Sequence, residues 1–187
     1  MSFPNSVLRI LRRLLVSEAA GSDYIGEPVC KASHMIQAAR NAHAKRESEE
    51  LVLACLFHDI GHLLAPDDTD GHGVANHAAL GAGLLHGIGI SDRTCDAVKH
   101  HVNAKRYLVG SDPFYELTPA SRITLGFQGG PMTCAQERYM FREHPAFEDA
   151  MAVREFDDTA KTDMLSGSDV GKAFDEFAPM ILKHVQK

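Results

Sequence analysis

The chain has 187 residues, of which 44% are apolar, and this is enough to bury the core of one domain. Its 25 acidic side chains outnumber the 19 basic ones, and the resulting net charge of −6 disfavours binding along a phosphate backbone. No apolar stretch is long enough to span a bilayer, and Arg9, Arg12 and Arg13 interrupt the apolar run that a signal peptide would need. We therefore predict one cytoplasmic domain over residues 1–187, without nucleic-acid or membrane partners.

Apolar residues recur at helical spacing along most of the chain. The first predicted helix carries the apolar stripe of residues 7–15 and ends at Gly21. A second helix begins at Pro28, which suits a first turn, and a third begins at Ser48, whose hydroxyl can cap it. The third helix ends at residues 58–62.

A polar loop over residues 66–73 precedes a fourth helix, which Asn76 can cap and which runs to about His86. No stretch shows a convincing alternation typical of strands, so we predict an all-α fold, a single compact helical bundle. The remaining helices are expected from Ser91 to about Tyr107, from Thr118 to before Gly129, and over about 133–143, 145–161 and 168–185.

Histidine is unusually frequent, with 11 in the chain, and it is the commonest metal ligand in proteins. The four cysteines form no CxxC pair, which disfavours a zinc knuckle or a dithiol redox site. The strongest signal is His58-Asp59 at the end of an apolar helix, where an imidazole and a carboxylate can turn toward one cation. His34 on the preceding helix and Asp157 on a late helix could complete such a site, although a bare His-Asp pair is commonly a surface feature.

One histidine, a His-Asp pair and a distant aspartate together resemble the HD-domain superfamily, a helical fold whose four ligands hold a metal ion. Members known for hydrolysis cut phosphate esters with a metal-bound water, so phosphohydrolase activity is one hypothesis for this protein. His77 and His101 raise the number of candidate ligands to six, which is enough for two metal ions. Nitrogen and oxygen ligands without a thiolate, with a carboxylate such as Asp59 able to bridge, suit a pair of iron ions.

Further motifs narrow the resemblance to the mixed-valent diiron oxygenases of the HD fold, and among them to the 2-amino-1-hydroxyethylphosphonate dioxygenase type. The similarity covers roughly residues 22–160. Besides the six candidate ligands, the following motifs carry it: Tyr24-Ile25-Gly26-Glu27, His58-Asp59-Ile60-Gly61-His62, His101-Val102-Asn103-Ala104-Lys105-Arg106-Tyr107-Leu108, Ala120-Ser121-Arg122, Gln128-Gly129-Gly130 and Arg154.

The resemblance implies a site with three groups of residues. A phosphonate dianion is bound well by a guanidinium group, an ammonium group and hydroxyl or imidazole donors. A carboxylate beside an aromatic ring suits a substituted ammonium group. The implied metal ligands are His34, His58, Asp59, His77, His101 and Asp157, with Asp59 bridging Fe(II) and Fe(III); the phosphonate pocket is His62, Lys105, Ser121 and Arg154; and Tyr24 and Glu27 form a catalytic loop that also contacts the substrate.

The implied reaction is an O2-dependent cleavage of the carbon–phosphorus bond of a 1-hydroxy-2-(trimethylammonio)ethylphosphonate, giving glycine betaine and phosphate. The same reaction on 2-amino-1-hydroxyethylphosphonate would give glycine and is the alternative. Likeness over the whole chain favours the trimethylated substrate, and Cys30 and Asn103 are candidates for the difference. An upstream hydroxylase is the expected partner in such a pathway.

Three other hypotheses about the function remain open from the sequence. A phosphohydrolase would need four ligands only and would work without O2. An inositol-oxygenase-like enzyme shares the diiron ligands but gives no reason for Lys105, Ser121 and Arg154. A degenerate HD domain could act as a binding module, which the intact set of six candidate ligands disfavours.

Overall fold

The computed structural model describes residues 2–23, 27–162 and 164–185, and the regular elements within these ranges are all helices. The described residues contain just two isolated β-bridges, Asp23 with Cys30 and Ile90 with Val185. The predicted all-α fold is therefore confirmed. None of the described helices combines the length and the apolar character that crossing a bilayer requires.

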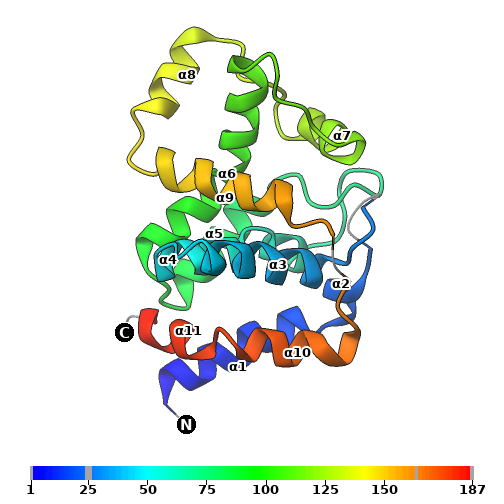
Figure 1. Ribbon diagram of the computed structural model, residues 1–187, viewed down its shortest axis with the longest axis vertical. Helices are drawn as coiled ribbons and strands as arrows, with labels where there is room; N and C mark the ends of the chain where they lie inside the picture. The colour runs from blue at the N-terminus through cyan, green and yellow to red at the C-terminus, as the bar shows by residue number, and fades with distance from the viewer. Residues whose placement is uncertain (1, 24–26, 163, 186–187) are drawn as a thin grey trace.

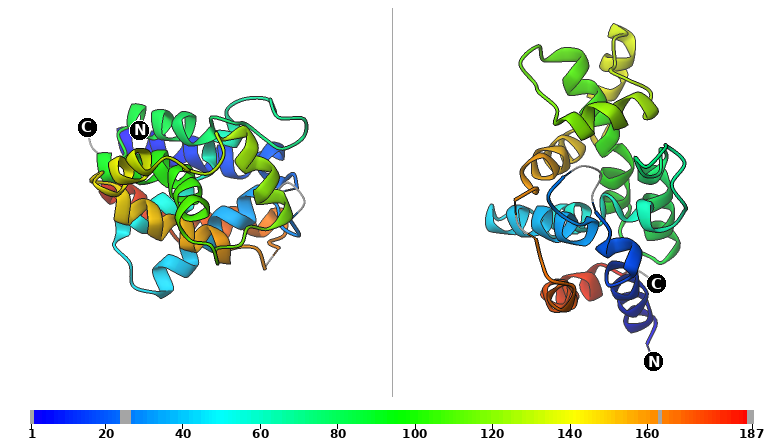
Figure 2. Two further views of the ribbon diagram at one scale, coloured as in Figure 1. Left: turned by 90° about the horizontal axis from the view of Figure 1, so that it is seen from above. Right: turned by 90° about the vertical axis from the view of Figure 1, so that its right-hand side faces the viewer.

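The helices form three levels, which Figures 1 and 2 show from different sides. At one end, the N-terminal helix lies beside the two C-terminal helices; a middle level follows, and a long helix rises from it to the far end. The first level is α1 (Phe3–Leu15), α10 (Gly167–Asp175) and α11 (Ala178–His184); the middle level is α3 (Lys31–Ala44), α4 (Glu49–Phe57), the 3-10 helix η1 (Ile60–Leu63) and α5 (His77–Gly87); above it lie α6 (Asp92–Ser111), α7 (Pro119–Phe127), α8 (Ala135–Arg142) and α9 (Phe147–Thr159).

The centre of the core is α4, in which every residue from Leu51 to Phe57 is buried. A helix that is apolar on all sides must be surrounded, and α4 packs against α3, α6 and α9. Ser48 caps its start, because the Ser48 hydroxyl accepts a hydrogen bond from the Leu51 amide at 3.3 Å, as predicted. The end of α4 therefore delivers His58 and Asp59 into the interior of the molecule.

Two predicted helices are each divided in the structure. The first ends at Leu15, and a short α2 (Glu18–Gly21) follows because the Ser17 hydroxyl accepts a hydrogen bond from the Ala20 amide and caps a new start. The last is split before Ala178, since Pro179 has no amide hydrogen and its ring would clash with a carbonyl one turn earlier in a continuous helix.

Two other boundaries were wrong by about one turn. The second predicted helix, α3, begins at Lys31 and not at Pro28, because Cys30 is its N-cap and its sulfur accepts a hydrogen bond from the Ser33 amide. Helix α6 continues to Ser111, beyond the predicted end near Tyr107. The start of α7 follows the prediction, because Thr118 accepts a hydrogen bond from the Ser121 amide at 3.2 Å.

Candidate metal centre and substrate cavity

Helices α3, α4, α5, α6 and α9 meet around one cluster of buried histidine and aspartate side chains. Each is at most 3% exposed, although histidine and aspartate are usually found at surfaces. The structure thus brings together the six predicted metal ligands, which are His34 on α3, His58 and Asp59 just after α4, His77 at the start of α5, His101 on α6 and Asp157 on α9.

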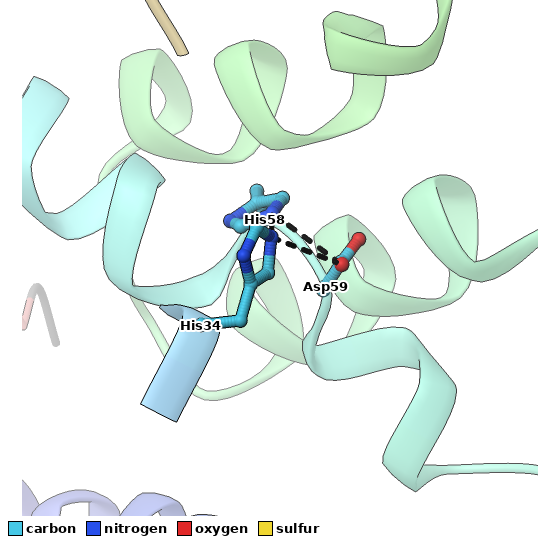
Figure 3. Close-up of side chains that lie close together, drawn as sticks. All are labelled: His34, His58 and Asp59. Atoms are coloured by element: carbon cyan, nitrogen blue, oxygen red, sulfur yellow. Dashed lines mark hydrogen bonds and ion pairs between the residues drawn. The ribbon is translucent and has the colours of Figure 1, made fainter. Parts of the chain in front are cut away.

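One carboxylate oxygen of Asp59 faces a first group of ligands. Asp59 Oδ2 lies 3.4 Å from His58 Nε2 and 3.8 Å from His34 Nε2, and Figure 3 shows both histidine rings turned toward it. Asp157 Oδ1 closes this group, at 3.1 Å from His34 Nε2 and 3.9 Å from His58 Nε2. Two imidazole nitrogens and two carboxylate oxygens therefore converge on one small space.

The other carboxylate oxygen of Asp59 faces a second group. Asp59 Oδ1 lies 3.2 Å from His77 Nε2 and 3.6 Å from His101 Nε2, and these two nitrogens are 3.2 Å apart. Asp59 thus stands between two sets of histidines, with one oxygen directed to each. This is the placement that a bridging carboxylate needs.

Backbone carbonyl groups determine which nitrogen of each histidine faces inward. Each Nδ1 atom lies at hydrogen-bond distance from a carbonyl oxygen, which can only accept, so Nδ1 carries the proton and Nε2 presents a lone pair. Two such lone pairs facing each other, as in His77 and His101, require a cation between them. The four contacts are His34 to Ala160 at 2.8 Å, His58 to Cys55 at 2.8 Å, His77 to Val74 at 2.9 Å and His101 to Val98 at 2.7 Å.

The carboxylates of this cluster also require positive charge. Asp59 Oδ2 and Asp157 Oδ1 are buried and accept no hydrogen bond from the residues that the structure describes. Burial lowers the pKa of His58, but the Asp59 and Asp157 charges outweigh it and raise this pKa to about 9. The raised pKa means that this place attracts positive charge, which a metal ion can supply. The donor set is therefore that of a metal centre.

His62 lies beside the cluster but differs from the four histidines above. Its Nδ1 accepts a hydrogen bond from the Val74 amide at 2.9 Å, so the proton of the neutral ring is on Nε2. Burial, with the nearby His77, lowers the pKa of His62 to about 3 and keeps it neutral. Although His62 is close enough to Asp59 and His77 to suggest a ligand, its Nε2 is an N–H donor. This favours the predicted role in anion binding.

A small cavity opens directly beside the second group of ligands. About 30 Å³ is open to the centre of a water molecule, which is room for roughly two waters. All the described residues predicted for the substrate pocket line this cavity, namely Glu27, His62, Lys105, Ser121 and Arg154, and Tyr24 lies outside the described residues.

Lys105 brings a buried ammonium group to this cavity from α6. Its Nζ donates a hydrogen bond to the Thr124 hydroxyl at 3.1 Å, and the side chain is almost fully buried. Burial, with repulsion from Arg154, lowers the pKa of Lys105 to about 8. An anion entering the cavity would stabilise the charged form of this lysine.

Arg154 supports Asp157, one of the predicted metal ligands, as well as lining the cavity. Its Nη1 donates to Asp157 Oδ2, its Nη2 donates to Asp158, and its Nε donates to the Tyr115 hydroxyl at 2.8 Å. Because Arg154 holds Oδ2, the Oδ1 atom of Asp157 is left to face His34. Arg154 thus positions the carboxylate of Asp157, a role that the sequence analysis missed.

Sequence reasoning also missed Lys161, one turn beyond Asp157 and just past the end of α9. Its Nζ lies 3.2 Å from Glu27 Oε1 and donates to the Ser121 hydroxyl at 3.3 Å. The spacing of four residues between Asp157 and Lys161 was the signal in the sequence that could have pointed to Lys161.

Two residues considered for the choice of substrate, Cys30 and Asn103, are absent from the cavity lining. Cys30 caps α3, and the Asn103 amide pairs with His100 on an outer face of α6.

Gly61 allows α5 to approach η1 closely enough for His77 to reach Asp59. A Cβ atom at Gly61 would lie 1.9 Å from the His77 carbonyl oxygen, which is backbone and cannot swing away. We expect Gly61→Ala to lower the free energy of unfolding by about 2 kcal/mol or more and to reduce the bound metal. Thermal unfolding and metal analysis would measure both.

Gly83→Ala on α5 is the matched control, because a Cβ there meets nothing within 4 Å. It should leave metal content unchanged and stabilise the helix by up to about 1 kcal/mol. Equal behaviour of the two variants would contradict the proposed close approach.

Comparison with known proteins places this site in a family. The HD domain model matches residues 31–159, a span that contains all six predicted ligands, and the chain belongs to the HD domain family. It is 37% identical over 173 residues, 88% of this chain and 84% of the relative, to a [1-hydroxy-2-(trimethylamino)ethyl]phosphonate dioxygenase (glycine-betaine-forming) from Leisingera caerulea.

Two further relatives span most of the chain. A hydroxymethylphosphonate dioxygenase from Gimesia maris is 35% identical over 80% of this chain and 77% of its own length. An uncharacterized protein of Acanthamoeba polyphaga mimivirus is 36% identical over 79% of this chain and 69% of its own length. The predicted resemblance to HD-fold phosphonate dioxygenases is thereby confirmed, and with it the prediction of an oxygenase.

Proposed function

We propose that this protein uses two iron ions and O2 to cleave the carbon–phosphorus bond of 1-hydroxy-2-(trimethylammonio)ethylphosphonate, giving glycine betaine and inorganic phosphate. The observation that carries the proposal is the placement of Asp59 between two groups of histidines, next to a cavity with cationic side chains. The relative from Leisingera caerulea supports the choice of substrate.

In this proposal His34, His58 and Asp157 would hold one iron, His77 and His101 would hold the other, and Asp59 would serve both with its two oxygens. Iron fits because the donors are imidazole and carboxylate, without a thiolate that would favour zinc. When bound, a mixed-valent pair of irons supplies the binding and reduction of O2. A four-ligand phosphohydrolase would leave the paired His77 and His101 without a joint role.

The protein's own part is to bind and orient the substrate. Lys105 and the Nε2–H of His62 would hold the phosphonate by charge and hydrogen bonding, with the Ser121 hydroxyl as a further donor. Arg154 adds positive charge while keeping Asp157 in place. These groups line one cavity with Asp59 and His101, so a phosphonate held by them brings its C1 carbon beside the metal centre.

Glu27 would receive the other end of the substrate. It is the acidic side chain among the described cavity-lining residues that is not a proposed ligand, so a cationic nitrogen has one carboxylate to approach. With phosphonate and cation at opposite ends, the substrate has one orientation. The resemblance to the family implies that Tyr24 also contacts the substrate.

The reaction balances with one molecule of O2. The alcohol carbon C1 loses its bond to phosphorus and its hydrogen, and becomes the carboxylate of glycine betaine in a four-electron oxidation. The phosphonate group gains one oxygen and leaves as hydrogen phosphate, and one proton is released. Because C1 must already carry a hydroxyl, a hydroxylase acting on the unhydroxylated phosphonate would have to supply the substrate.

Phosphorus NMR of the iron-loaded protein tests this function. The trimethylammonio and the primary-amine 1-hydroxyethylphosphonates would each be incubated with and without O2. We expect phosphate only when O2 is present, with the trimethylated compound cleaved faster. Phosphate release that does not depend on O2, together with hydrolysis of phosphate esters, would instead identify a phosphohydrolase.

A further inference from the structure

The geometry points to Lys161 as a residue that sets how strongly the cavity selects a cationic substrate. We propose that Lys161 competes with the substrate's cationic nitrogen for the carboxylate of Glu27. This inference rests on the proposed function, since it concerns the same cavity. It assigns a specificity role to a residue outside the predicted site.

The ion pair between Glu27 and Lys161 is well sheltered. Their side chains are 10% and 9% exposed, and Lys161 Nζ lies 3.2 Å from Glu27 Oε1. The same Oε1 atom accepts a hydrogen bond from the Thr118 hydroxyl at 2.7 Å, so the carboxylate is fixed toward α7 and the end of α9. Water screens such a pair less than it screens a surface pair, and its charges therefore matter for a ligand nearby.

A cation in the cavity must use this carboxylate. Among the described residues that line the cavity, the other carboxylates are Asp59 and Asp157, which face the histidines. In the structure the charge of Glu27 is already balanced by Lys161. A trimethylammonium group, which cannot donate a hydrogen bond, meets no net negative charge at this end until Lys161 moves away.

Lys161 has a second partner that it would keep if a cation took its place at Glu27. Its ammonium donates to the Ser121 hydroxyl at 3.3 Å, and Ser121 lines the cavity near Lys105. A substrate with a cation at one end and a phosphonate at the other would therefore replace Lys161 at Glu27 while Lys161 keeps its hydrogen bond to Ser121. A phosphonate without a cation would leave the ion pair intact.

The proposal predicts an order of selectivity from the net charge of the pair. The wild-type pair is neutral, Lys161→Met leaves −1, Glu27→Gln leaves +1, and the double variant is neutral again. The preference for a cationic over an uncharged ligand should therefore be highest in Lys161→Met and lowest in Glu27→Gln. The double variant should return near the wild-type value. We expect about a tenfold change for each single variant, which is a fraction of the Coulomb attraction between two unit charges a few ångströms apart in a sheltered site.

The test compares two ligands that differ only in charge. They are 1-hydroxy-2-(trimethylammonio)ethylphosphonate and 1-hydroxy-3,3-dimethylbutylphosphonate, in which a tert-butyl group replaces the trimethylammonium group. Anaerobic calorimetry on the iron-loaded protein gives the ratio of the two Kd values, and kcat/KM with O2 gives a second ratio. A general loss of phosphonate affinity cancels in both ratios.

Lys172→Met is the control, because the Lys172 side chain is 81% exposed, and it should leave both ratios unchanged. A ratio in Lys161→Met at or below the wild-type value would overturn the proposal. Absence of cleavage by the wild-type protein would refute the proposed function instead, whereas the calorimetric ratio would still test Lys161.

Discussion

Replacing Asp59 by asparagine is expected to abolish iron binding at both positions and to lower kcat about a thousandfold or more. Asp59 directs one oxygen to His58 and the other to His77, so a single carboxylate serves both groups of ligands. An amide has no negative charge, and its NH2 group would point at a histidine lone pair. Several kcal/mol of metal-dependent stabilisation would be lost with the metal.

Iron analysis and phosphate release would measure the effect of Asp59→Asn. Glu155→Gln on α9 is a matched control, because Glu155 is an exposed acid outside the cavity lining. It should bind iron and turn over like the wild type. Full iron content in Asp59→Asn would remove the basis for a bridging role.

Replacing Lys105 by methionine should lower kcat/KM about 10- to 100-fold while iron content stays unchanged. The reason is the loss of one charge-assisted hydrogen bond to the phosphonate. Lys105 pairs with Thr124 and with no metal ligand, so its removal should spare the metal centre. Arg154 offers a less clean test, because removing it would also release Asp157.

The same lysine predicts a pH dependence. Since burial lowers the pKa of Lys105 to about 8, the charged form that binds a phosphonate is present below that pH and is lost above it. In the wild type, kcat/KM should fall by up to about tenfold per pH unit above pH 8. This fall should be absent in Lys105→Met.

Lys99→Met on the same helix is the control for Lys105→Met, because Lys99 is exposed and lies outside the cavity lining. Its kcat/KM and pH profile should match the wild type. Loss of iron in Lys105→Met, or an unchanged fall of kcat/KM above pH 8, would contradict the assignment of Lys105 to the phosphonate.

The amino-acid sequence by itself determined the helical fold and, through its resemblance to a family, which histidine and aspartate side chains meet in the buried cluster. Helical spacing of apolar residues is a local property, and caps such as Ser48 and Thr118 act within one turn, so both can be predicted. The boundaries at Ser17 and Cys30 were missed because competing caps a few residues apart differ little in free energy.

Only the tertiary structure decided how these residues act on one another. The proton position of His34 depends on the carbonyl group of Ala160, which folding brings close, and His62 accepts a hydrogen bond from the Val74 amide. The contact of Glu27 with Lys161 joins a loop before α3 to the residues after α9. Such contacts arise from packing between distant segments, and no local pattern encodes them.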